Sequence, residues 1–550
     1  MEFIKPKEKL GESTTTNLLS ADGPHSGTRG CKYSRKNLIF ISVCALSVFL
    51  YFSKLYKWTL IWEQFKTRHE EMTVDEVMFS LSWASSTSKY TSFNNTSSAQ
   101  HSVVWLEQRR AQYCVGDTLN VLVEMRNYAG QPKANGGDFI VARIHSPKLQ
   151  ACASGDVTDL LNGFYRVRFH LFWPGEVQVS VRLMHSSEAV DVLRRDWKKD
   201  YTKISHRGTF KVGRKQETTP CALRLDSDRA LCEYRKKEDG EYYACYQPQT
   251  LPCNSLAIMR AFSYKGPNLT KEDSQLLAKE NIGIEIKNSF KPVTVVGCTG
   301  ASHAPTEKCV AGMNSPFPGG YFYSNRWLPS FCQADPFFSE AAITRCLKGK
   351  ILYILGDSTA RQWLEYLTIK VKGLRIVSGS RFQSYLAVHA RNNITVRWMK
   401  HNHPWNSNFA SDVKAATIPE VLDSIAVGGR QKDAIVVIGI GQHFRPFPPE
   451  VFIRRLQSIR RAILRLQARS HEARVVIKLE NNLEFKSPMI TVSDWYGHMQ
   501  NLAQRKVFEG MKVAVVDVWD MTVATSSFSV HPNQVIVYNQ VALALSYSCL

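Results

Sequence analysis

The stretch "KILYILGDSTARQW", residues 350–363, passes from an apolar run through a glycine to an acid, a hydroxyl and a helical pattern. A short apolar run that ends at glycine indicates a buried strand, and Asp or Ser is the usual cap of a helix that follows. Ser358 therefore has two interpretations, a helix cap or a nucleophile. The Gly-Asp-Ser tripeptide alone favours the cap. Evidence from other parts of the sequence is needed to choose between the two roles.

The region after residue 346 continues this alternation. Further strands are predicted in "NITVRWMK", "AIVVIGIG", "ARVVIKLE" and "KVAVVDVW", and helices in "PEVFIRRLQSIRRAILRLQARS" and "QVIVYNQVALALSYSC". Continuous Val, Ile and Leu strands separated by helices are typical of a largely parallel sheet that is covered on both faces. Residues 346–550 are therefore predicted to form an α/β domain.

Two regions of different character precede this domain. From residue 106 to 215, short alternating runs such as "TLNVLVEMRN" and "EVQVSVRLMH" recur about every ten residues, which predicts an immunoglobulin-like antiparallel sandwich. Nothing polar within it indicates chemistry, so we expect a scaffold or a glycan-contacting module. Residues 216–345 are rich in cysteine and aromatic residues and are expected to form a disulfide-pinned connector that packs onto the α/β domain.

The N-terminal part predicts a membrane anchor. Residues 38–53 carry no charge, and as a helix they would span about 24 Å, which basic and aromatic flanking residues can extend. Residues 1–37 are expected to be a cytosolic tail, because seven Lys and Arg against four Asp and Glu give it a charge of +3. Residues 54–105, rich in Ser, Thr and Asn, read as a stem. A cleaved signal peptide, which would release a secreted form, is the alternative.

This orientation places the rest of the chain in the secretory lumen, as a type II protein of the Golgi or another secretory membrane. Four N-x-S/T sequons agree with it, at Asn94, Asn95, Asn268 and Asn393. Eleven cysteines then lie in the lumen, and their spacing favours disulfides over zinc. The odd count leaves one thiol free or shared with a second chain in a disulfide-linked dimer.

The chain is strongly basic, with a formal charge of +22, of which +19 remains once the tail is set aside. In the lumen this charge excludes nucleic acid as a partner and favours anionic glycans or membrane surfaces, although a merely soluble basic surface is an equal alternative.

Reactive groups in parallel α/β sheets lie at the carboxyl ends of the strands. Ser358 has that position, where the helix N-terminus favours a developing negative charge. Other strand ends and loops bring further candidates: Gly379 as an amide donor, then Gly439, Gly441, Gln442 and His443, then Asp517, Asp520 and, before the last helix, His531. The order serine, acid, histidine is one of the known orders for nucleophilic hydroxyl catalysis.

The segments "GYFYSNRWLPSFC", "TRCL" and "LKGKILYILGDSTARQWLEYL" together resemble the PC-esterase branch of the GDSL/SGNH superfamily. With the sandwich, "GQHFRPFP" and "VHP", the arrangement is similar to the neurexophilin and PC-esterase domain family. That resemblance covers nearly the whole lumenal region. Its relatives include plant polysaccharide O-acetyltransferases and the Golgi sialate O-acetyltransferase, so it implies transfer of an acetyl group to or from a glycan hydroxyl.

Carried over to this chain, the resemblance makes Ser358 the nucleophile, His531 the base and Arg361 the arginine that steadies the site or an anionic substrate. Gly379 and the turn from Gly439 to Gly441 would supply oxyanion donors.

Two departures from the superfamily pattern matter. Phe528 stands where a D-x-x-H motif has its acid, so Asp520 and then Asp517 are the candidates for the orienting acid. No asparagine matches the G-x-N-D motif in "GIGQHF", so Gln442 or backbone amides must substitute.

Other residues remain alternatives for the base and its partner: His443, and the pair Asp494 and His498. His401 and His403 are expected to contact substrate or the core and not a metal, because no acid matches them. We therefore expect no bound metal or cofactor.

The predicted reaction passes through an acyl-serine, with a sugar hydroxyl or water as acceptor. Sialic acid on glycoproteins is the leading acceptor. A transferase would need an acetyl donor such as acetyl-CoA, and a single anchor has no pore, so a partner transporter or another lumenal donor is implied. The alternative is an inactive glycan-binding or adhesion protein, because the triad is imperfect.

Overall fold

The computed structural model describes residues 71–83, 92–199, 204–225, 228–236, 241–264, 269–298, 305–401, 411–412, 416–426, 434–483 and 492–549. The predicted cytosolic tail and anchor lie outside these residues, as does most of the predicted stem. Among the helices described, none combines the length and the apolar character needed to cross a bilayer.

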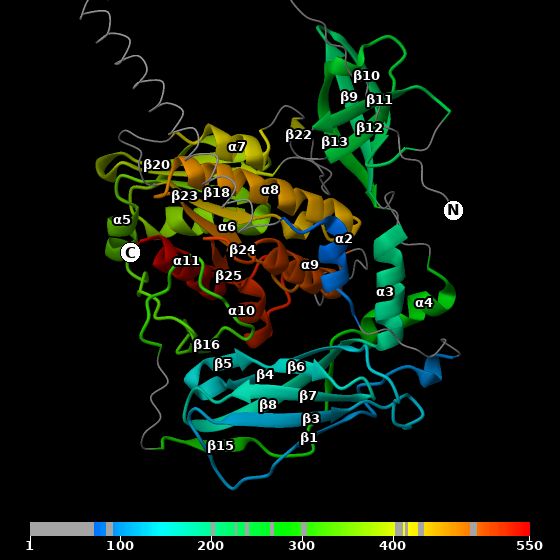
Figure 1. Cartoon of the computed structure of the whole chain (residues 1–550), viewed down its shortest axis with the longest axis vertical. Coiled ribbons are helices and arrows are strands. Elements are labelled where there is room, and N and C mark those ends of the chain that lie inside the picture. Colours follow the sequence, from blue (N-terminus) through cyan, green and yellow to red (C-terminus); the bar gives the residue numbers. More distant parts are fainter. Residues whose placement is uncertain are drawn as a thin grey trace, which may run out of the picture. The chain divides into compact units, whose positions relative to one another are not determined.

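The C-terminal region is built on a seven-stranded sheet in the order β19-β20-β21-β18-β23-β24-β25 (Figure 1). Its strands β21, β18, β23, β24 and β25 are parallel neighbours, and β19 and β20 add an antiparallel hairpin at one edge. The strand bounds are β18 Ile351–Gly356, β19 Arg375–Ser380, β20 Ser384–His389, β21 Ile394–Lys400, β23 Ala434–Gly439, β24 Arg474–Lys478 and β25 Ala514–Val516.

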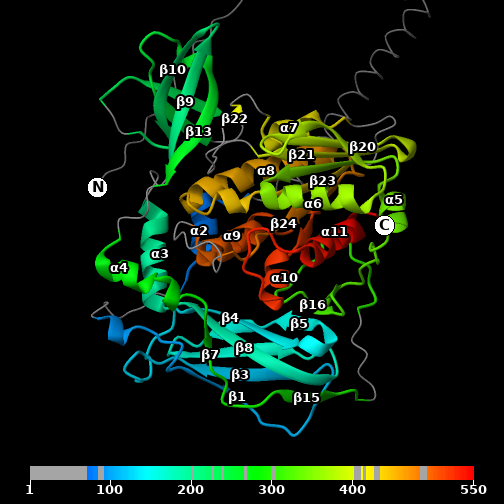
Figure 2. The ribbon, with the colours of Figure 1, turned by 180° about the vertical axis from the view of Figure 1, so that it is seen from behind.

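Helices cover both faces of this sheet, as the sequence predicts. One face packs against α7 (Ile418–Ser424), α8 (Pro449–Arg469) and α9 (Asp494–Val507). The other packs against α5 (Glu340–Leu347), α6 (Ser358–Lys370) and α11 (Gln534–Ser548), and Figure 2 shows α6 and α11 side by side. Successive residues of a strand point to opposite faces, so Ile354 enters one core and Leu355 the other.

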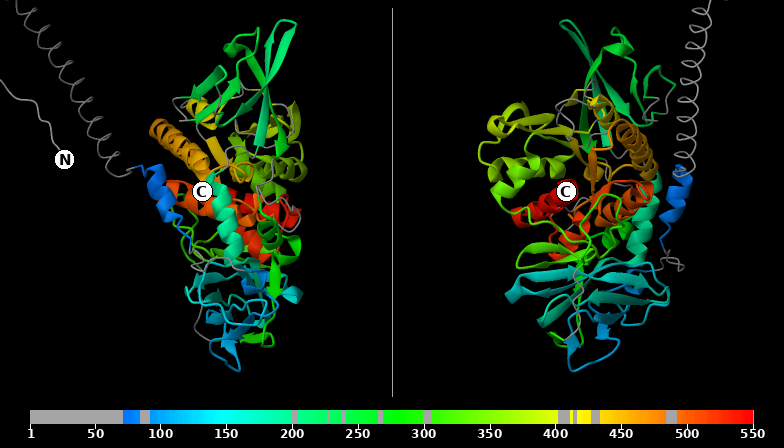
Figure 3. Two further views of the ribbon diagram at one scale, coloured as in Figure 1. Left: turned by 90° about the vertical axis from the view of Figure 1, so that its right-hand side faces the viewer. Right: turned by 60° about the vertical axis from the view of Figure 1, so that its left-hand side comes forward.

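A β-sandwich lies N-terminal to this domain (Figure 3). One layer is the four-stranded sheet β1-β3-β7-β6, the other the eight-stranded sheet built around β4 and β8, and a shared apolar core lies between them. The bounds are β1 Val103–Leu106, β2 Tyr113–Cys114, β3 Thr118–Glu124, β4 Phe139–Ser146, β5 Ala151–Ser154, β6 Asp156–Asp159, β7 Phe164–His170 and β8 Gly175–His185. The antiparallel sandwich is present; its immunoglobulin-like character stays a prediction.

The predicted connector is more ordered than its composition indicates. Four of its strands join the larger sandwich sheet: β14 Ile284–Ile286, β15 Val293–Val296, β16 Gly320–Tyr323 and β17 Arg326–Pro329. Its strands β10 Lys215–Ala222, β11 Leu231–Lys236, β12 Glu241–Tyr246 and β13 Leu256–Tyr264 form a separate sheet with two strands from outside the connector, β9 Ile204–Val212 and β22 Ser411–Asp412. The strand order of this sheet is β11-β12-β10-β9-β13-β22. Because β9 pairs with β10, this sheet runs across the predicted boundary at residue 215.

Ten cysteines form disulfides, which agrees with the predicted framework. The pairs are Cys114–Cys298, Cys221–Cys245, Cys232–Cys253, Cys309–Cys332 and Cys346–Cys549. Cys152 is the free thiol among the described residues; it is buried in β5, and burial raises its pKa to about 12.

Three of the four sequons lie in described parts of the chain. Asn94 and Asn95 are exposed in a short 3-10 helix, and Asn393 is exposed in the turn before β21. Asn268 lies outside the described residues.

Candidate active site

Ser358 is the first residue of α6, and one residue, Asp357, separates it from the end of β18. Asp357 caps this helix: its Oδ1 accepts hydrogen bonds from the Thr359 amide at 2.9 Å and the Thr359 hydroxyl at 2.7 Å. Gly356 allows the tight turn, because a Cβ there would lie 1.9 Å from the Gly439 carbonyl oxygen of the neighbouring strand. The capping role thus belongs to Asp357, which leaves the Ser358 hydroxyl available for other chemistry.

His531 supplies a base for that hydroxyl. Its Nε2 lies 2.8 Å from the Oγ of Ser358, within the distance at which a general base takes a proton. His531 lies in the loop between α10 (Val518–Ala524) and α11, and the next residue is tied to α6, since Gln362 Nε2 donates to the Pro532 carbonyl at 3.3 Å. Burial lowers the pKa of His531, so the ring is neutral at pH 7 and can accept the serine proton.

The two predicted orienting acids have other partners. Asp517 caps α10, receives a hydrogen bond from the Asp520 amide and pairs with the Arg505 guanidinium at 2.5 Å. Asp520 is buried and accepts a hydrogen bond from the Gly319 amide at 2.6 Å, and burial raises its pKa to about 7. Both carboxylates belong to the β25–α10 junction, which directs them to α9 and to the chain before β16. Among the described residues, His531 has no hydrogen bond to a carboxylate.

The predicted oxyanion donors are largely engaged. The Gly441 amide donates to Glu480 Oε1 at 2.8 Å, and the Gln442 amide donates to Asp357 Oδ2 at 3.2 Å. The Gln442 side chain donates to the Asn481 carbonyl at 3.1 Å. The Ser358 amide belongs to the first turn of α6, whose N–H groups have no partner within the helix, so it is a donor beside the nucleophile.

The two remaining predicted glycines have structural surroundings. Gly439 is the last residue of β23 and is paired with Gly356, the last residue of β18. Gly379 lies in the edge hairpin, paired with Tyr385, at a φ of +107° that favours glycine.

His443 and His401 contact each other and lie close to three further basic side chains, those of Lys400, Arg361 and His531. His443 Nδ1 is 2.6 Å from His401 Nε2, and burial lowers the pKa of His443 to about 4, with Lys400, Arg361 and His531 acting in the same direction. His443 is therefore neutral at pH 7. His401 contacts this ring; His403 lies outside the described residues.

Arg361 is held over the Trp398 ring, 5.5 Å from its centre. Its Nε pairs with Glu365 at 2.8 Å and its Nη1 donates to the Arg381 carbonyl at 2.9 Å. These contacts fix a positive charge one helical turn after the serine.

The alternative pair Asp494 and His498 is remote from this chemistry. Asp494 forms a fully buried ion pair with Arg445 at 2.9 Å. His498 packs among the rings of Trp83, Phe139 and Trp519, and burial lowers its pKa to about 4. The structure does not bring this pair to Ser358.

Sequence reasoning missed the last residue of β24 and the polar residues that follow this strand. Lys478 is fully buried and donates to the Thr359 hydroxyl at 2.8 Å, so it braces the turn that carries Ser358. Glu480 is also buried, and burial together with the charge of Asp357 raises its pKa to about 7. Asn481 donates from Nδ2 to the Val530 carbonyl, one residue before His531. The available signal was "IKLENN", a run of polar residues directly after a buried parallel strand.

Family models match this chain in two places. The model described as "NXPE family member 4-like, C-terminal domain" matches residues 327–549, and the model described as "Neurexophilin" matches residues 82–267. The first range holds both Ser358 and His531, and the second holds the sandwich strands β1 to β8. The chain belongs to the neurexophilin and PC-esterase domain (NXPE) family. Its C-terminal domain is thus of the PC-esterase-like type, which groups it with esterase and acyltransferase folds.

Two solved structures illustrate distant likenesses to this NXPE chain. An acetylxylan esterase from Geobacillus stearothermophilus is 15% identical over 36% of this chain and 91% of its own, with a TM-score of 0.19. Invasin, a bacterial integrin-binding protein, is 11% identical over 56% of this chain and 60% of its own, with a TM-score of 0.14. Likenesses at these TM-scores say nothing about the fold or activity of the NXPE chain.

Proposed function

We propose that this NXPE protein is a serine-dependent O-acyltransferase or esterase that acts on glycan hydroxyls in the secretory lumen, with an SGNH-type C-terminal domain. One observation carries the proposal: the 2.8 Å contact between Ser358 Oγ and His531 Nε2, at the junction of β18 and α6. A hydroxyl within reach of a neutral imidazole, at a helix N-terminus, is the arrangement that activated serine nucleophiles require.

The proposed reaction has two steps. His531 takes the proton of Ser358 as Oγ bonds to the acyl carbon of the donor, and the leaving group departs with that proton. A sugar hydroxyl then attacks the acyl carbon and loses its proton to His531, which passes the proton to Ser358 Oγ as the acyl–Oγ bond breaks. Water in place of the sugar hydroxyl gives hydrolysis. The basic residues near Ser358 favour a negatively charged acceptor or donor, and we propose the hydroxyls of sialic acid, with an acetyl group as cargo.

The location and donor belong to the same proposal. A type II anchor in a Golgi or related membrane fits the sequence, as does a secreted form after cleavage. The acetyl donor, acetyl-CoA or a lumenal substitute, then requires a transporter partner. No bound metal or cofactor enters either step.

The alternative is an inactive glycan-binding protein, and the lack of a carboxylate partner for His531 among the described residues is what favours it. Cells that make the parent chain, Ser358→Ala, or the control Ser82→Ala, an exposed serine with no part in the site, separate the two. The proposal expects acetyl groups on released sialoglycans, by mass spectrometry, to rise with the parent and the control and not with Ser358→Ala. Equal acetylation by the parent and Ser358→Ala, above untransfected cells, would refute the nucleophile.

A further inference from the structure

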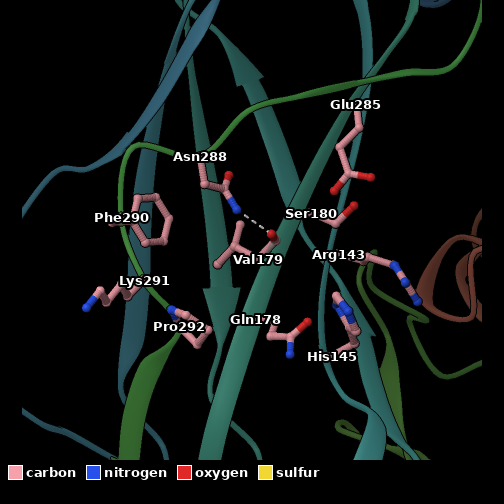
Figure 4. A pocket seen from close by; sticks show the side chains of 10 residues that line it. All are labelled: Arg143, His145, Gln178, Val179, Ser180, Glu285, Asn288, Phe290, Lys291 and Pro292. Atoms are coloured by element: carbon pink, nitrogen blue, oxygen red, sulfur yellow. Dashed lines mark hydrogen bonds between the residues drawn. The ribbon is translucent and has the colours of Figure 1, made fainter.

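The edge of β8 has a gap in its pairing. β14 pairs with residues 181–183 of β8 and β15 with residues 175–177, while the chain between them, residues 287–292, leaves the edge. Asn288 replaces part of the missing ladder, since its Nδ2 donates to the Val179 carbonyl at 2.6 Å. The gap borders a pocket with a volume of about 320 Å³ (Figure 4).

The register of the sheet places polar side chains together in this pocket. Residues that face each other across two strands share one face of the sheet, and here His145 lies opposite Gln178 and Arg143 opposite Ser180. Glu285 of β14 joins the same side (Figure 4). The wall therefore combines an imidazole, an amide, a hydroxyl, a guanidinium and a carboxylate, which together can donate and accept hydrogen bonds.

Some of the lining atoms are buried without a partner among the described residues. They are Nε of Arg143, Nδ1 of His145 and Oδ1 of Asn288. Burial lowers the pKa of His145 to about 4, so this ring is neutral at pH 7. Buried polar atoms ordinarily have a partner, so these three atoms have unused hydrogen-bonding capacity beside the pocket.

The charges in the pocket do not favour an anion. Arg143 donates from Nη1 to the Ala524 carbonyl at 3.1 Å, and Glu285 is paired with Arg182 at 3.0 Å. Lys291 is exposed and extends away from His145 and Glu285 (Figure 4). The cations therefore do not converge on one point, as recognition of a carboxylate or phosphate requires.

We propose that this pocket binds an uncharged pyranose unit of a glycan. Sugar hydroxyls both donate and accept, as the wall does. The Phe290 ring packs partly against the sandwich core, and its remaining surface lines the other side of the pocket, where the apolar C–H face of a pyranose can contact it. The volume lies at the lower end of the range for small-molecule sites, about 300–1,000 Å³, which suits one sugar unit. The site is separate from Ser358, so it would hold a glycan whether or not the chain transfers acyl groups.

The test is saturation-transfer NMR on the full chain in detergent, carried out in a Ser358→Ala background so that no ligand is turned over. The probes are the methyl glycosides of galactose and N-acetylglucosamine, with methyl sialoside as the anionic arm. Gln178→Ala and Ser180→Val remove polar groups of the wall, and Thr294→Ala, exposed on the neighbouring β15, is the matched control.

The proposal expects an uncharged glycoside to bind with a Kd of about 1 mM and the wall variants to weaken it at least about tenfold, a loss of 1.4 kcal/mol, while the control does not. Equal binding by wall variants and control would overturn it, as would binding of the sialoside alone or no binding of either neutral glycoside at about 10 mM. Unchanged thermal unfolding of the variants shows that a loss of binding is not a loss of the fold.

Discussion

Asn481 fixes the loop that carries the proposed base: its Nδ2 donates to the Val530 carbonyl at 3.1 Å, although 49 positions separate the two residues. Asn481 is fully buried after β24, and its own carbonyl accepts hydrogen bonds from Gln442 and Arg445. A rigid, buried amide therefore sets where His531 stands relative to Ser358. The hydrogen bond to its loop, and not an orienting carboxylate, therefore keeps His531 beside Ser358.

Asn481→Ala should lower kcat and leave KM nearly unchanged, because it frees the loop of His531 without removing any group that binds substrate. Misplacement of a base by about 1 Å costs up to about 100-fold in rate, so we expect a loss of about 10- to 100-fold. Hydrolysis of a chromogenic acetate ester by the full chain measures both constants. The exposed Thr294→Ala is the control, and a change in KM alone would contradict the positioning role.

Asp520→Asn should leave kcat/KM within about threefold of the parent. Its carboxylate contacts Gly319, whereas loss of a true triad acid costs about 10⁴. A loss of that size would show that Asp520 does orient His531.

The same variant should change how stability depends on pH. The folded chain holds the Asp520 proton up to a pKa of about 7, whereas the unfolded chain releases it near 3.8, so the parent loses stability as pH rises through that window. Asn has no proton to release, so Asp520→Asn does not lose stability in this pH range. In urea unfolding, the stability of Asp520→Asn relative to the parent should rise from about pH 4 to about pH 8 by on the order of 4 kcal/mol, because the two pKa values differ by about three units. If the difference in unfolding free energy between Asp520→Asn and the parent did not change with pH, the raised pKa of Asp520 would be contradicted.

The pH profile of kcat/KM should fall on the acid side with a midpoint below 6.5. Burial, together with the charges of Arg361 and Lys478, lowers the pKa of His531, and the base works only in its neutral form. Rate therefore rises as pH increases through the lowered pKa. Arg361→Gln removes one positive charge and should move the midpoint upward, besides any effect on the rate itself. A midpoint above 6.5 in the parent would be inconsistent with this account.

Removal of the Cys346–Cys549 disulfide should destabilise the C-terminal domain by about 2–5 kcal/mol, because the bond closes a loop of 203 residues between α5 and the end of α11. Thermal unfolding of the double Ala variant measures this loss. Cys152→Ala, which removes a buried free thiol and no crosslink, is the comparison and should cost less. Equal losses would mean that the crosslink contributes little.

The sequence predicted well what local patterns determine. Continuous Val and Ile runs between helical segments gave the parallel sheet, and the strand–glycine–helix pattern placed Ser358 at its edge. Pairing between strands that are far apart in the sequence could not be predicted from local patterns. The strands β14 to β17 join the sandwich sheet, although their composition predicts a connector. The failure to foresee the partners of Asp517 has the same cause, since Arg505 on α9 competes for its carboxylate only once the chain is folded.

The most direct test of the central claim is to trap the acyl-enzyme. The full chain is mixed with an activated acetyl ester, quenched rapidly with acid and digested, and the peptides are sequenced by mass spectrometry. The account predicts an acetyl group on the Ser358 hydroxyl in the parent, none in Ser358→Ala, and slow acetylation in His531→Ala. Turnover by the parent with no acetyl group on Ser358, or turnover by Ser358→Ala at the parent rate, would contradict it.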